Sequence, residues 1–510
     1  MHRIRIITVI LILLFYYWTA STSKADGTYS FRINERYLSQ YDLLTRAFFD
    51  RRLDLPINVP KKLLELENPY NSNANASFRV GGFHDVSLYK GKAYIYFGPT
   101  PVITLLLPYY CLPANIKTFV SKIDPKSNNY MSSNLAILIF SFGTLIWASL
   151  FLFYIKEKYF QDIPEWMISV SILVLGLCNL SPFLLRRPFI YEIAISSGCF
   201  FLMGAIYFFS ISFKNTIPNL IFMSLGGLFI GLSAGCRPHF IITGTLITFI
   251  VLLKIMFSNI QTIQSSKKNL AITLIAPILI CYSLLLIYNY IRFNEITEFG
   301  ISYQLGSKSG RRDVYKDLFM WGSICNILKR FSLYTLQPPV IKSYFPYIFL
   351  HSLGTEKVAG TIPLFPFVTL TFVSPFLYLR HKLLFKFRFT EIIFSWFEFL
   401  LLTITTLANL GFLTIYRSTT MRHTGDYLST LILCTSIIWF YFYIKLKDTF
   451  FLRRILSFFA ILSAFVSIIN GTAISITGCY WGLRSQNPKQ FRLLESKFKP
   501  ISNIISQFVD

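Results

Sequence analysis

Charged residues are scarce in this chain: only 14% of its 510 residues are Asp, Glu, Lys or Arg, and only 24 are acidic. Soluble globular domains carry roughly a quarter of charged residues. Hydrophobic residues make up 54% of the chain and aromatic residues 17%. The composition therefore excludes an ordinary soluble enzyme and is typical of a polytopic, all-α membrane protein.

Signatures of soluble nucleotide or metal chemistry are also missing. The chain has no Walker A loop, no dinucleotide-binding fingerprint and no serine-nucleophile elbow. Its eight cysteines are scattered through apolar runs without C-x-x-C or Cys/His spacing. The sequence is therefore compatible with a divalent metal, but no pattern demands one or any other cofactor. The net charge of +25 is explained by the positive-inside rule and by anionic membrane lipid, and we expect no nucleic-acid partner.

Eleven apolar segments are long enough to span a hydrocarbon core, which takes about 20 residues. They lie near 5–20, 134–154, 166–184, 190–211, 219–235, 239–257, 270–290, 362–379, 392–416, 427–444 and 455–475. The apolar run 102–112 is shorter and is bracketed and interrupted by four prolines. We therefore expect it to be interfacial or re-entrant. The first segment is read as an uncleaved span because aromatic residues end it, with a cleaved signal peptide as the alternative.

The basic residues predict the orientation. With the N-terminus in the cytoplasm, the inside loops hold sixteen Lys and Arg residues and the short outside loops hold five, as the positive-inside rule requires. One membrane domain, 1–475, then carries two large extracytoplasmic loops, 22–133 and 291–361, and an extracytoplasmic tail, 476–510. The first loop contains an amphipathic segment around 37–50 that predicts an interfacial helix.

All five basic residues of the short outside loops are arginines: Arg186, Arg187, Arg237, Arg417 and Arg422. Arginine binds phosphate oxygens in a bidentate manner, so these residues predict a pocket for a phosphorylated headgroup. The alternative is that they only reach to lipid phosphates at helix ends. Glu192 and Asp426 stand near these arginines at span entrances, where a carboxylate is costly and suggests a function. The alternative is that Glu192 only pairs with a nearby arginine and that Asp426 only pairs with Arg422, four residues before it.

Two further groups are candidates for binding and catalysis. Glu298 lies among tyrosines just outside a span, and aromatic faces beside carboxylates suit sugars, although an interfacial aromatic belt explains them as well. In the first loop, Asp42 stands four residues before Arg46, so a surface ion pair accounts for it. Asp85 has no such partner in sequence and directly precedes the proline-rich segment, which is where a base at the membrane surface is expected.

The segments "QYDLLTRAFFDRRLDLP" and "GKAYIYFGPTP" resemble elements of the GT-C superfamily of polytopic glycosyltransferases that use lipid-linked sugars, especially its branch of aminoarabinose transferases and protein O-mannosyltransferases. Uncharacterised bacterial membrane proteins share the fuller element Y-x-G-K-x-Y-x-Y-F-G-P-x-P, here 89–101. Three further segments show a weaker resemblance: "RRPFIYE", "GLSAGCRP" and "MRHTGDY". With them, the resemblance extends over most of the chain.

The resemblance implies a GT-C-like fold of about 11 transmembrane helices, with interfacial or re-entrant helices in the first loop. It also implies an enzyme of the bacterial inner membrane that transfers a sugar from a polyprenyl phosphate to an extracytoplasmic glycolipid or polysaccharide. The family's catalytic carboxylate lies just before the interfacial helix, where this chain has Ser39 and Gln40 between Glu35 and Asp42. Asp85 and Asp42 are therefore alternative bases.

If the chain is such a glycosyltransferase, four arginines are expected to bind the donor phosphate: Arg186, Arg187, Arg237 and Arg422. The expected substrate-binding residues are Tyr94, Tyr96, Glu192, Glu298 and Asp426. A transporter or flippase for a lipid-linked sugar would need the arginines but no base. A polysaccharide ligase or polymerase would depend on residues of the second large loop.

Overall fold

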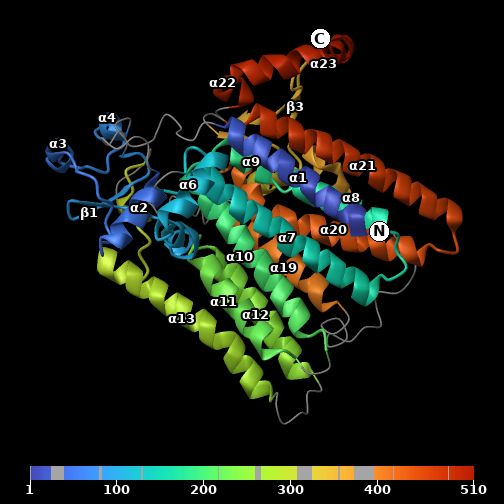
Figure 1. Ribbon diagram of the computed structural model, residues 1–510, viewed down its shortest axis with the longest axis horizontal. Helices are drawn as coiled ribbons and strands as arrows, with labels where there is room; N and C mark the ends of the chain where they lie inside the picture. The colour runs from blue at the N-terminus through green and yellow to red at the C-terminus, as the bar shows by residue number, and fades with distance from the viewer. Residues whose placement is uncertain are drawn as a thin grey trace.

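The computed structural model describes residues 2–23, 39–79, 83–127, 130–215, 218–258, 266–306, 324–353, 356–372, 396–416, 418–479 and 482–509. Most of these residues are helical, and the strands form only short two-stranded hairpins. Nine helices in the described part of the chain are long and apolar enough to cross a membrane. The chain is accordingly an all-α integral membrane protein (Figure 1).

Nine of the eleven predicted spans correspond to these helices. They are α1 (His2–Thr22), α7 (Ser133–Tyr159), α8 (Glu165–Cys178) continued by α9 (Ser181–Arg186), α10 (Ile190–Ser212), α12 (Phe240–Phe257), α13 (Lys267–Phe293), α19 (Phe397–Ile415), α20 (Gly425–Lys445) with the turn before it, and α21 (Phe450–Thr477).

The other two predicted spans differ. The segment 219–235 forms α11 (Leu220–Ala234), an apolar helix of 15 residues. The segment 362–379 begins with the short helices α16 (Thr361–Leu364) and η4 (Pro366–Val368), and from 373 on it lies outside the described residues. Its described start is inside the bundle, because the Phe367 ring lies 6.0 Å from the Trp439 ring of α20.

Helix α11 packs closely against α13 because its glycines lack side chains. Gly227 and Gly231 stand four residues apart and therefore on one face of the helix. A Cβ atom at Gly227 would lie 2.3 Å from the backbone oxygen of Leu274, and one at Gly231 would lie 2.5 Å from Cys281. Small residues at this spacing let two membrane helices approach backbone to backbone.

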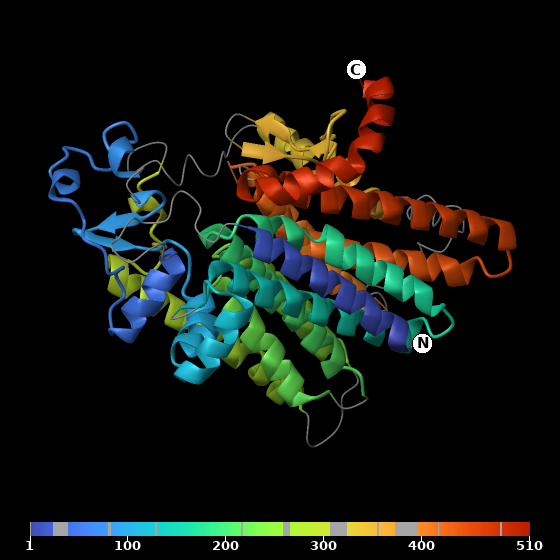
Figure 2. The ribbon, with the colours of Figure 1, turned by 45° about the horizontal axis from the view of Figure 1, so that its top comes forward.

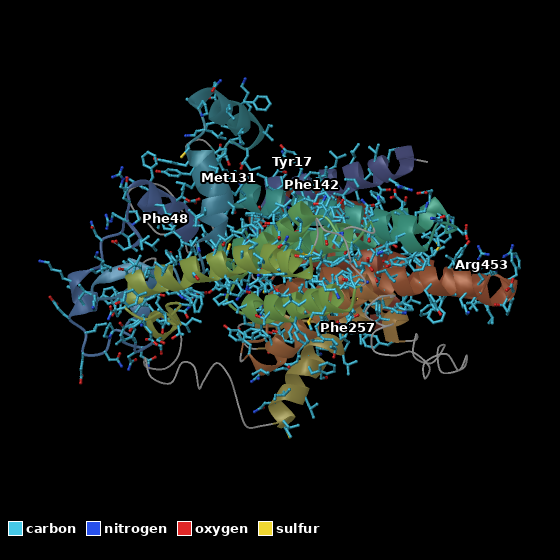
Figure 3. The ribbon with its side chains drawn as sticks, turned by 90° about the horizontal axis from the view of Figure 1, so that it is seen from below. Tyr17, Phe48, Met131, Phe142, Phe257 and Arg453 are labelled. Carbon is cyan, nitrogen blue, oxygen red and sulfur yellow. The ribbon has the colours of Figure 1, made fainter. Side chains whose placement is uncertain are left out.

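One end of the bundle, called the basic end, collects the lysines and arginines predicted to be cytoplasmic. Arg5 Nε lies 2.6 Å from Glu165 Oε2, which also pairs through its other oxygen with Lys156. Lys158 Nζ lies 2.8 Å from Glu398. Figure 3 shows Arg453 at this end and Phe48 at the other. Among the described residues, these ion pairs hold the N-terminus, the loop between α7 and α8 and the start of α19 at one end, while the assignment of each loop to a side of the membrane stays a prediction.

The opposite end, called the loop end, carries the first loop around the end of α13 (Figures 1 and 2). Its elements are α2 (Gln40–Phe49), α3 (Lys61–Leu64), α4 (Ala76–Phe78), the hairpin of β1 (Ser87–Tyr89) and β2 (Lys92–Tyr94), η2 (Val102–Leu106), α5 (Leu107–Tyr110) and α6 (Ala114–Ile123). The amphipathic helix predicted around 37–50 corresponds to α2. The run 102–112 forms the joined helices η2 and α5, which are too short to cross a bilayer.

The second loop and the tail also lie at the loop end. The described second loop contains η3 (Ile301–Tyr303), α15 (Ile324–Thr335), and two hairpins, β3 (Val340–Ile341) with β4 (Ile348–Phe349) and β5 (His351–Leu353) with β6 (Glu356–Val358). The tail forms α22 (Leu483–Gln486) and α23 (Pro488–Val509).

Candidate active site at the loop end

Charged and polar side chains from separate segments meet at the loop end around Asp85. The charged groups come from the first loop, the start of α10, the second loop and the turn that precedes α20. We call this group the Asp85 cluster: His84, Asp85, Arg187, Tyr191, Glu192, Gln304, Glu356 and Arg422.

Asp85 is buried, with 8% of its surface exposed. The Tyr191 hydroxyl donates a hydrogen bond to Asp85 Oδ2. Gln304 Nε2 donates to Asp85 Oδ1 at 2.7 Å, and His84 Nε2 lies 3.3 Å from Oδ2. Burial raises the pKa of the Asp85 carboxyl, and the nearby charges of His84 and Arg422 oppose that rise. A carboxyl with a raised pKa in a cluster of polar groups is a candidate proton acceptor.

Local backbone structure places this carboxylate. Asp85 has a φ of +57°, a left-handed conformation that Asp and Asn adopt more readily than most residues. Strand β1 starts two residues later, and the hairpin turns at Lys90 and Gly91, which both have positive φ. Such a turn joins two strands tightly, so the hairpin holds Asp85 against the bundle.

The second loop supplies the partner of Asp85 through its own ordered turn. Glu298 accepts hydrogen bonds from the backbone N–H groups of Gly300 and Ser302. Ser87 Oγ then donates to the Gly300 carbonyl at 2.8 Å, and the Leu305 N–H donates to the Val86 carbonyl at 2.8 Å. These contacts join the turn to β1 and place Gln304 beside Asp85.

The ring of Tyr191 gathers two arginines beside the carboxylate. The guanidinium carbon of Arg422 lies 4.3 Å from the centre of the Tyr191 ring, and that of Arg187 lies 5.8 Å from it. Arg187 also pairs with Glu192 at 3.7 Å, and Arg422 pairs with Glu356 at 3.4 Å. Tyr191 therefore links the base candidate to two cations that can bind an anion.

A second buried group, the Asp426 cluster, adjoins the first. Asp426 forms its ion pair with Arg237 and lies 3.3 Å from His239 Nε2, while Asn409 donates to its backbone carbonyl at 3.1 Å. The His239 ring stacks on Phe412 at 4.6 Å. These contacts hold Arg237 in place. The Tyr416 hydroxyl lies within electrostatic range of Asp85, Arg237 and Arg422, so the two clusters share one polar region.

Two of the sequence motifs meet beneath these clusters. The Thr100 N–H donates to the Gly235 carbonyl at 3.1 Å. A Cβ atom on Gly98 would lie 2.1 Å from that carbonyl oxygen, so only glycine permits this approach. The contact joins "FGPTP" to "SAGCRPH", two stretches far apart in the chain, and positions Arg237 and His239.

Several predicted site residues have other roles in the structure. Arg186 is fully buried, donating to the Ser475 carbonyl at 2.9 Å and to Thr22 Oγ1 at 2.9 Å. Asp42 completes a capping box with Ser39 at the start of α2. Glu298 caps its turn, as described above. These placements favour structural roles for all three residues.

The two predicted sugar-binding tyrosines separate. The Tyr94 ring packs on Phe293 at 5.3 Å, in an aromatic group with Tyr89 and Tyr303 that is distinct from the Asp85 cluster. Tyr96 lies in the polar region: burial raises the pKa of its hydroxyl, and the nearby charge of Asp85 raises it further. Of the pair, Tyr96 is the better candidate for contact with a substrate.

Sequence reasoning missed Tyr191, Gln304, Glu356 and His84. Tyr191 had a signal, because it stands between Arg187 and Glu192 in "RRPFIYE". Gln304 and Glu356 had none, since their proximity to the first loop and to α20 arises from tertiary contacts. Arg417 lies outside the described residues.

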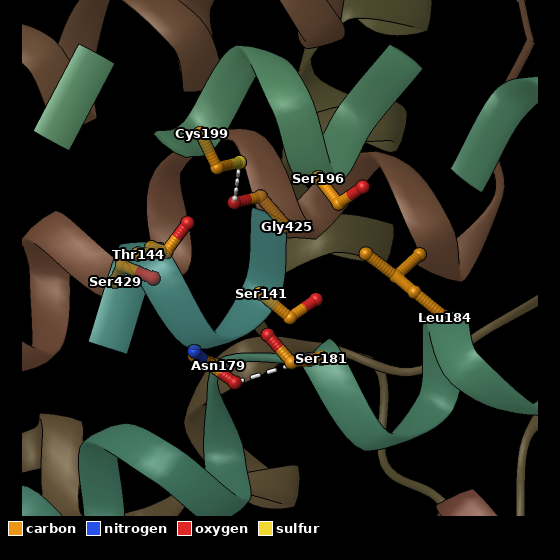
Figure 4. Close-up of a pocket in the computed structure, with 9 residues that line it drawn as sticks. All are labelled: Ser141, Thr144, Asn179, Ser181, Leu184, Ser196, Cys199, Gly425 and Ser429. Carbon is orange, nitrogen blue, oxygen red and sulfur yellow. Dashed lines mark hydrogen bonds between the residues drawn. The ribbon is translucent and has the colours of Figure 1, made fainter. Parts of the chain in front are cut away.

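A small polar cavity lies inside the bundle, next to Gly425 at the start of α20 (Figure 4). Its lining residues are Ser141, Thr144, Asn179, Ser181, Leu184, Ser196, Cys199, Gly425 and Ser429. Cys199 donates to the Gly425 carbonyl at 3.3 Å, and the Ser181 N–H donates to Asn179 at 3.0 Å. The cavity has room for roughly one water molecule and not for a sugar.

The site combines a buried carboxylate, a tyrosine that orients it and arginines that can bind an anion. Among the described residues, no three His, Cys, Asp or Glu side chains are grouped so that they could hold a metal ion. No known protein family, curated protein or solved structure matches this chain.

Proposed function

We propose that this protein is a membrane glycosyltransferase of GT-C type, which moves a sugar from a polyprenyl phosphate to an extracytoplasmic glycolipid or polysaccharide. The observation that carries the proposal is the contact of Tyr191 with Asp85, Arg187 and Arg422. It brings a base candidate and two anion-binding groups to one place at a membrane surface. A transferase that uses a lipid phosphate needs both.

In the proposed reaction, Asp85 accepts the proton of the acceptor hydroxyl. The acceptor oxygen forms a bond to the anomeric carbon of the sugar, the bond from that carbon to the phosphate oxygen breaks, and polyprenyl phosphate leaves. Arg187 and Arg422 stabilise the charge that develops on the leaving phosphate. Tyr191 holds the carboxylate in place, and Tyr96 lines the sugar pocket.

The membrane setting is part of the proposal. The polyprenyl chain would lie in the bilayer beside the bundle, with its phosphate at the loop end. The positive-inside rule assigns that end to the extracytoplasmic face, and we place the protein in a bacterial inner membrane.

The decisive test compares Asp85→Asn with Asp42→Asn in a deletion strain complemented with each variant. Asn keeps the size of Asp85 and tolerates its positive φ, so Asp85→Asn removes the base with little change in structure. We expect lipid-linked sugar to accumulate and one glycan residue to be lost with Asp85→Asn, and not with Asp42→Asn. Unaltered glycans with Asp85→Asn would exclude Asp85 as the base, and the reverse pattern would favour Asp42.

A second test measures binding of polyprenyl phosphate to the purified full chain. Hydrogen bonds to charged groups contribute about 1.5–3 kcal/mol, so Arg422→Gln and Arg187→Gln should each weaken binding roughly ten- to hundredfold. The matched control is Arg52→Gln, since Arg52 pairs with Asp54 in the first loop, outside the Asp85 cluster. Equal affinities for all three variants would contradict the assigned phosphate site.

A ligase or polymerase is the second candidate, because two members of the Asp85 cluster belong to the second loop: Gln304, which contacts Asp85, and Glu356, which contacts Arg422. Gln304→Ala and Glu356→Gln should reduce transfer only partly if Asp85 is the base. Complete loss of polymer in these variants, with activity retained in Asp85→Asn, would favour the second candidate. A flippase would retain function in all variants that still bind the donor.

A further inference from the structure

The tail helix α23 presents an apolar face that no described segment covers. Leu493, Ile501 and Ile504 lie on one side of the helix, because they are spaced by eight and three residues. Their exposed fractions are 52%, 41% and 58%. Figures 1 and 2 show α23 outside the bundle, on the side of α21.

The position of α23 is set by contacts with the second loop. The Phe345 ring stacks on Phe498 at 5.4 Å and also lies 5.4 Å from the Phe491 ring. The Tyr347 hydroxyl donates to the Phe498 carbonyl at 2.7 Å. The helix is therefore anchored along one side, and the exposed apolar side chains belong to the face that is left.

The basic residues of α23 indicate the kind of surface that the apolar face contacts. The helix carries exposed Lys489, Arg492, Lys497 and Lys499, and Glu495 is the acidic residue within its bounds. Lys489 and Lys497 stand four residues before and after Leu493, so they lie on the same side of the helix as the apolar residues. Arg492 and Lys499 lie on the opposite face. Lysines on the apolar side of a helix can extend their ammonium groups to the headgroups of an anionic membrane while the apolar side chains enter the acyl region.

We propose that α23 binds the surface of the bilayer that holds the same chain, with Leu493, Ile501 and Ile504 among the acyl chains and Lys489 and Lys497 on anionic headgroups. The span α21 ends at Thr477, eleven residues before α23 begins, so the helix lies within reach of that surface. This role is separate from the proposed transfer reaction.

The test places the photo-crosslinking residue p-benzoylphenylalanine at position 504 or 503 of the full chain. Both positions are exposed, but Asn503 lies on the polar face and is the matched control. Each protein is reconstituted into nanodiscs of phosphatidylcholine, with or without phosphatidylglycerol, and irradiated. Lipid adducts are then quantified by mass spectrometry. We expect several-fold more lipid adducts from 504 than from 503.

Charge is tested with the pair Lys489→Gln and Lys497→Gln in the protein that carries the probe at 504. Adducts should fall several-fold in discs with phosphatidylglycerol and stay unchanged in pure phosphatidylcholine. Equal lipid adducts at 503 and 504 would overturn the proposal, as would crosslinks from 504 mainly to a second copy or to another part of the chain. An equal fall in both lipids would overturn the role of the two lysines.

Discussion

At the scale of single residues, Asp42 and Asp85 show how surroundings assign different roles to the same side chain. Both belong to the first loop and both are buried. Asp42 accepts the Ser39 backbone N–H at 2.8 Å, within its own helix terminus. Asp85 accepts from Tyr191 and Gln304, which lie far away in sequence. The first arrangement stabilises a helix, whereas the second connects a carboxylate to a cation cluster.

The pH dependence of transfer should respond to His84. An ionised Asp85 is required for proton acceptance, so activity is lost as the pH falls through the Asp85 pKa. The charge of His84 lowers that pKa, and His84→Gln should therefore raise it and shift the acidic limb of the rate profile to higher pH. Lys92→Gln is the control, because Lys92 pairs with Asp54. An unshifted limb in His84→Gln would contradict this assignment.

The stability of the protein should respond to Asp42. Burial raises the pKa of Asp42 to about 6 from its ordinary value of 3.8. A carboxyl whose pKa is higher in the folded state than in the unfolded state stabilises the fold at a pH below the unfolded-state pKa. This stabilisation is lost as the pH rises through the folded-state pKa. The loss amounts to about 3 kcal/mol, at about 1.4 kcal/mol for each pKa unit.

Asp42→Asn removes the cost of burying the charge and keeps an oxygen for the Ser39 N–H. We expect its melting temperature, followed by tryptophan fluorescence in detergent, to equal or exceed that of the wild type at pH 7.5. At pH 4 the variant should have no such advantage. The expectation would be refuted if the melting temperature of Asp42→Asn, compared with that of the wild type, were clearly lower at pH 7.5 than at pH 4.

At the scale of elements, the site depends on two backbones that touch. The proline-rich segment after β2 meets the turn between α11 and α12 through Gly98 and Gly235. That contact orients Arg237, which holds Asp426 at the start of α20. A change in the packing of these elements therefore shifts the side chains of the Asp426 cluster without altering any charge.

Gly98→Ala tests this contact. The added methyl group would clash with the Gly235 carbonyl, and overpacking of this kind costs about 1–3 kcal/mol. We expect a lower melting temperature and reduced transfer. Gly411→Ala in α19 is the control: no atom lies within 4 Å of the added Cβ, and alanine favours a helix over glycine by up to about 1 kcal/mol. Equal stability of the two variants would show that the contact is dispensable.

At the scale of the whole molecule, the bundle separates its loops into two ends with different chemistry. The basic end pairs Lys and Arg residues with Glu165 and Glu398. The loop end holds the Asp85 and Asp426 clusters, all of the described strands and four amphipathic helices, α2, α6, α15 and α23. A lipid-linked substrate would enter from the bilayer and meet the charged groups only at the loop end.

Cysteine labelling tests which end faces outward. Cys111 and Cys325 are exposed at the loop end, and Asp448 is exposed at the basic end, between α20 and α21. In right-side-out vesicles, a membrane-impermeant maleimide should label Cys111 and Cys325. It should not label a protein with Asp448→Cys in a background where Cys111 and Cys325 are replaced by serine. Labelling of the Asp448→Cys protein alone would show that the basic end faces outward, opposite to the predicted topology.

The sequence by itself determined the membrane-spanning helices and the grouping of the described loops into two ends. Both depend on local composition, since about twenty apolar residues form a helix in a bilayer whatever their neighbours are. It also pointed to Arg187 and Arg422, because arginines are unexpected in outside loops at span ends, and to Asp85, because that carboxylate has no ion-pair partner nearby in sequence.

Only the tertiary structure decided which of these charges meet. Arg186 and Arg187 are adjacent in sequence, yet one is buried against α1 and α21 and the other joins the Asp85 cluster. Gln304 and Glu356 reach the cluster from another loop. The physical reason is that a hydrogen bond or ion pair forms between groups a few ångströms apart in space, and long-range packing, not local pattern, sets those distances.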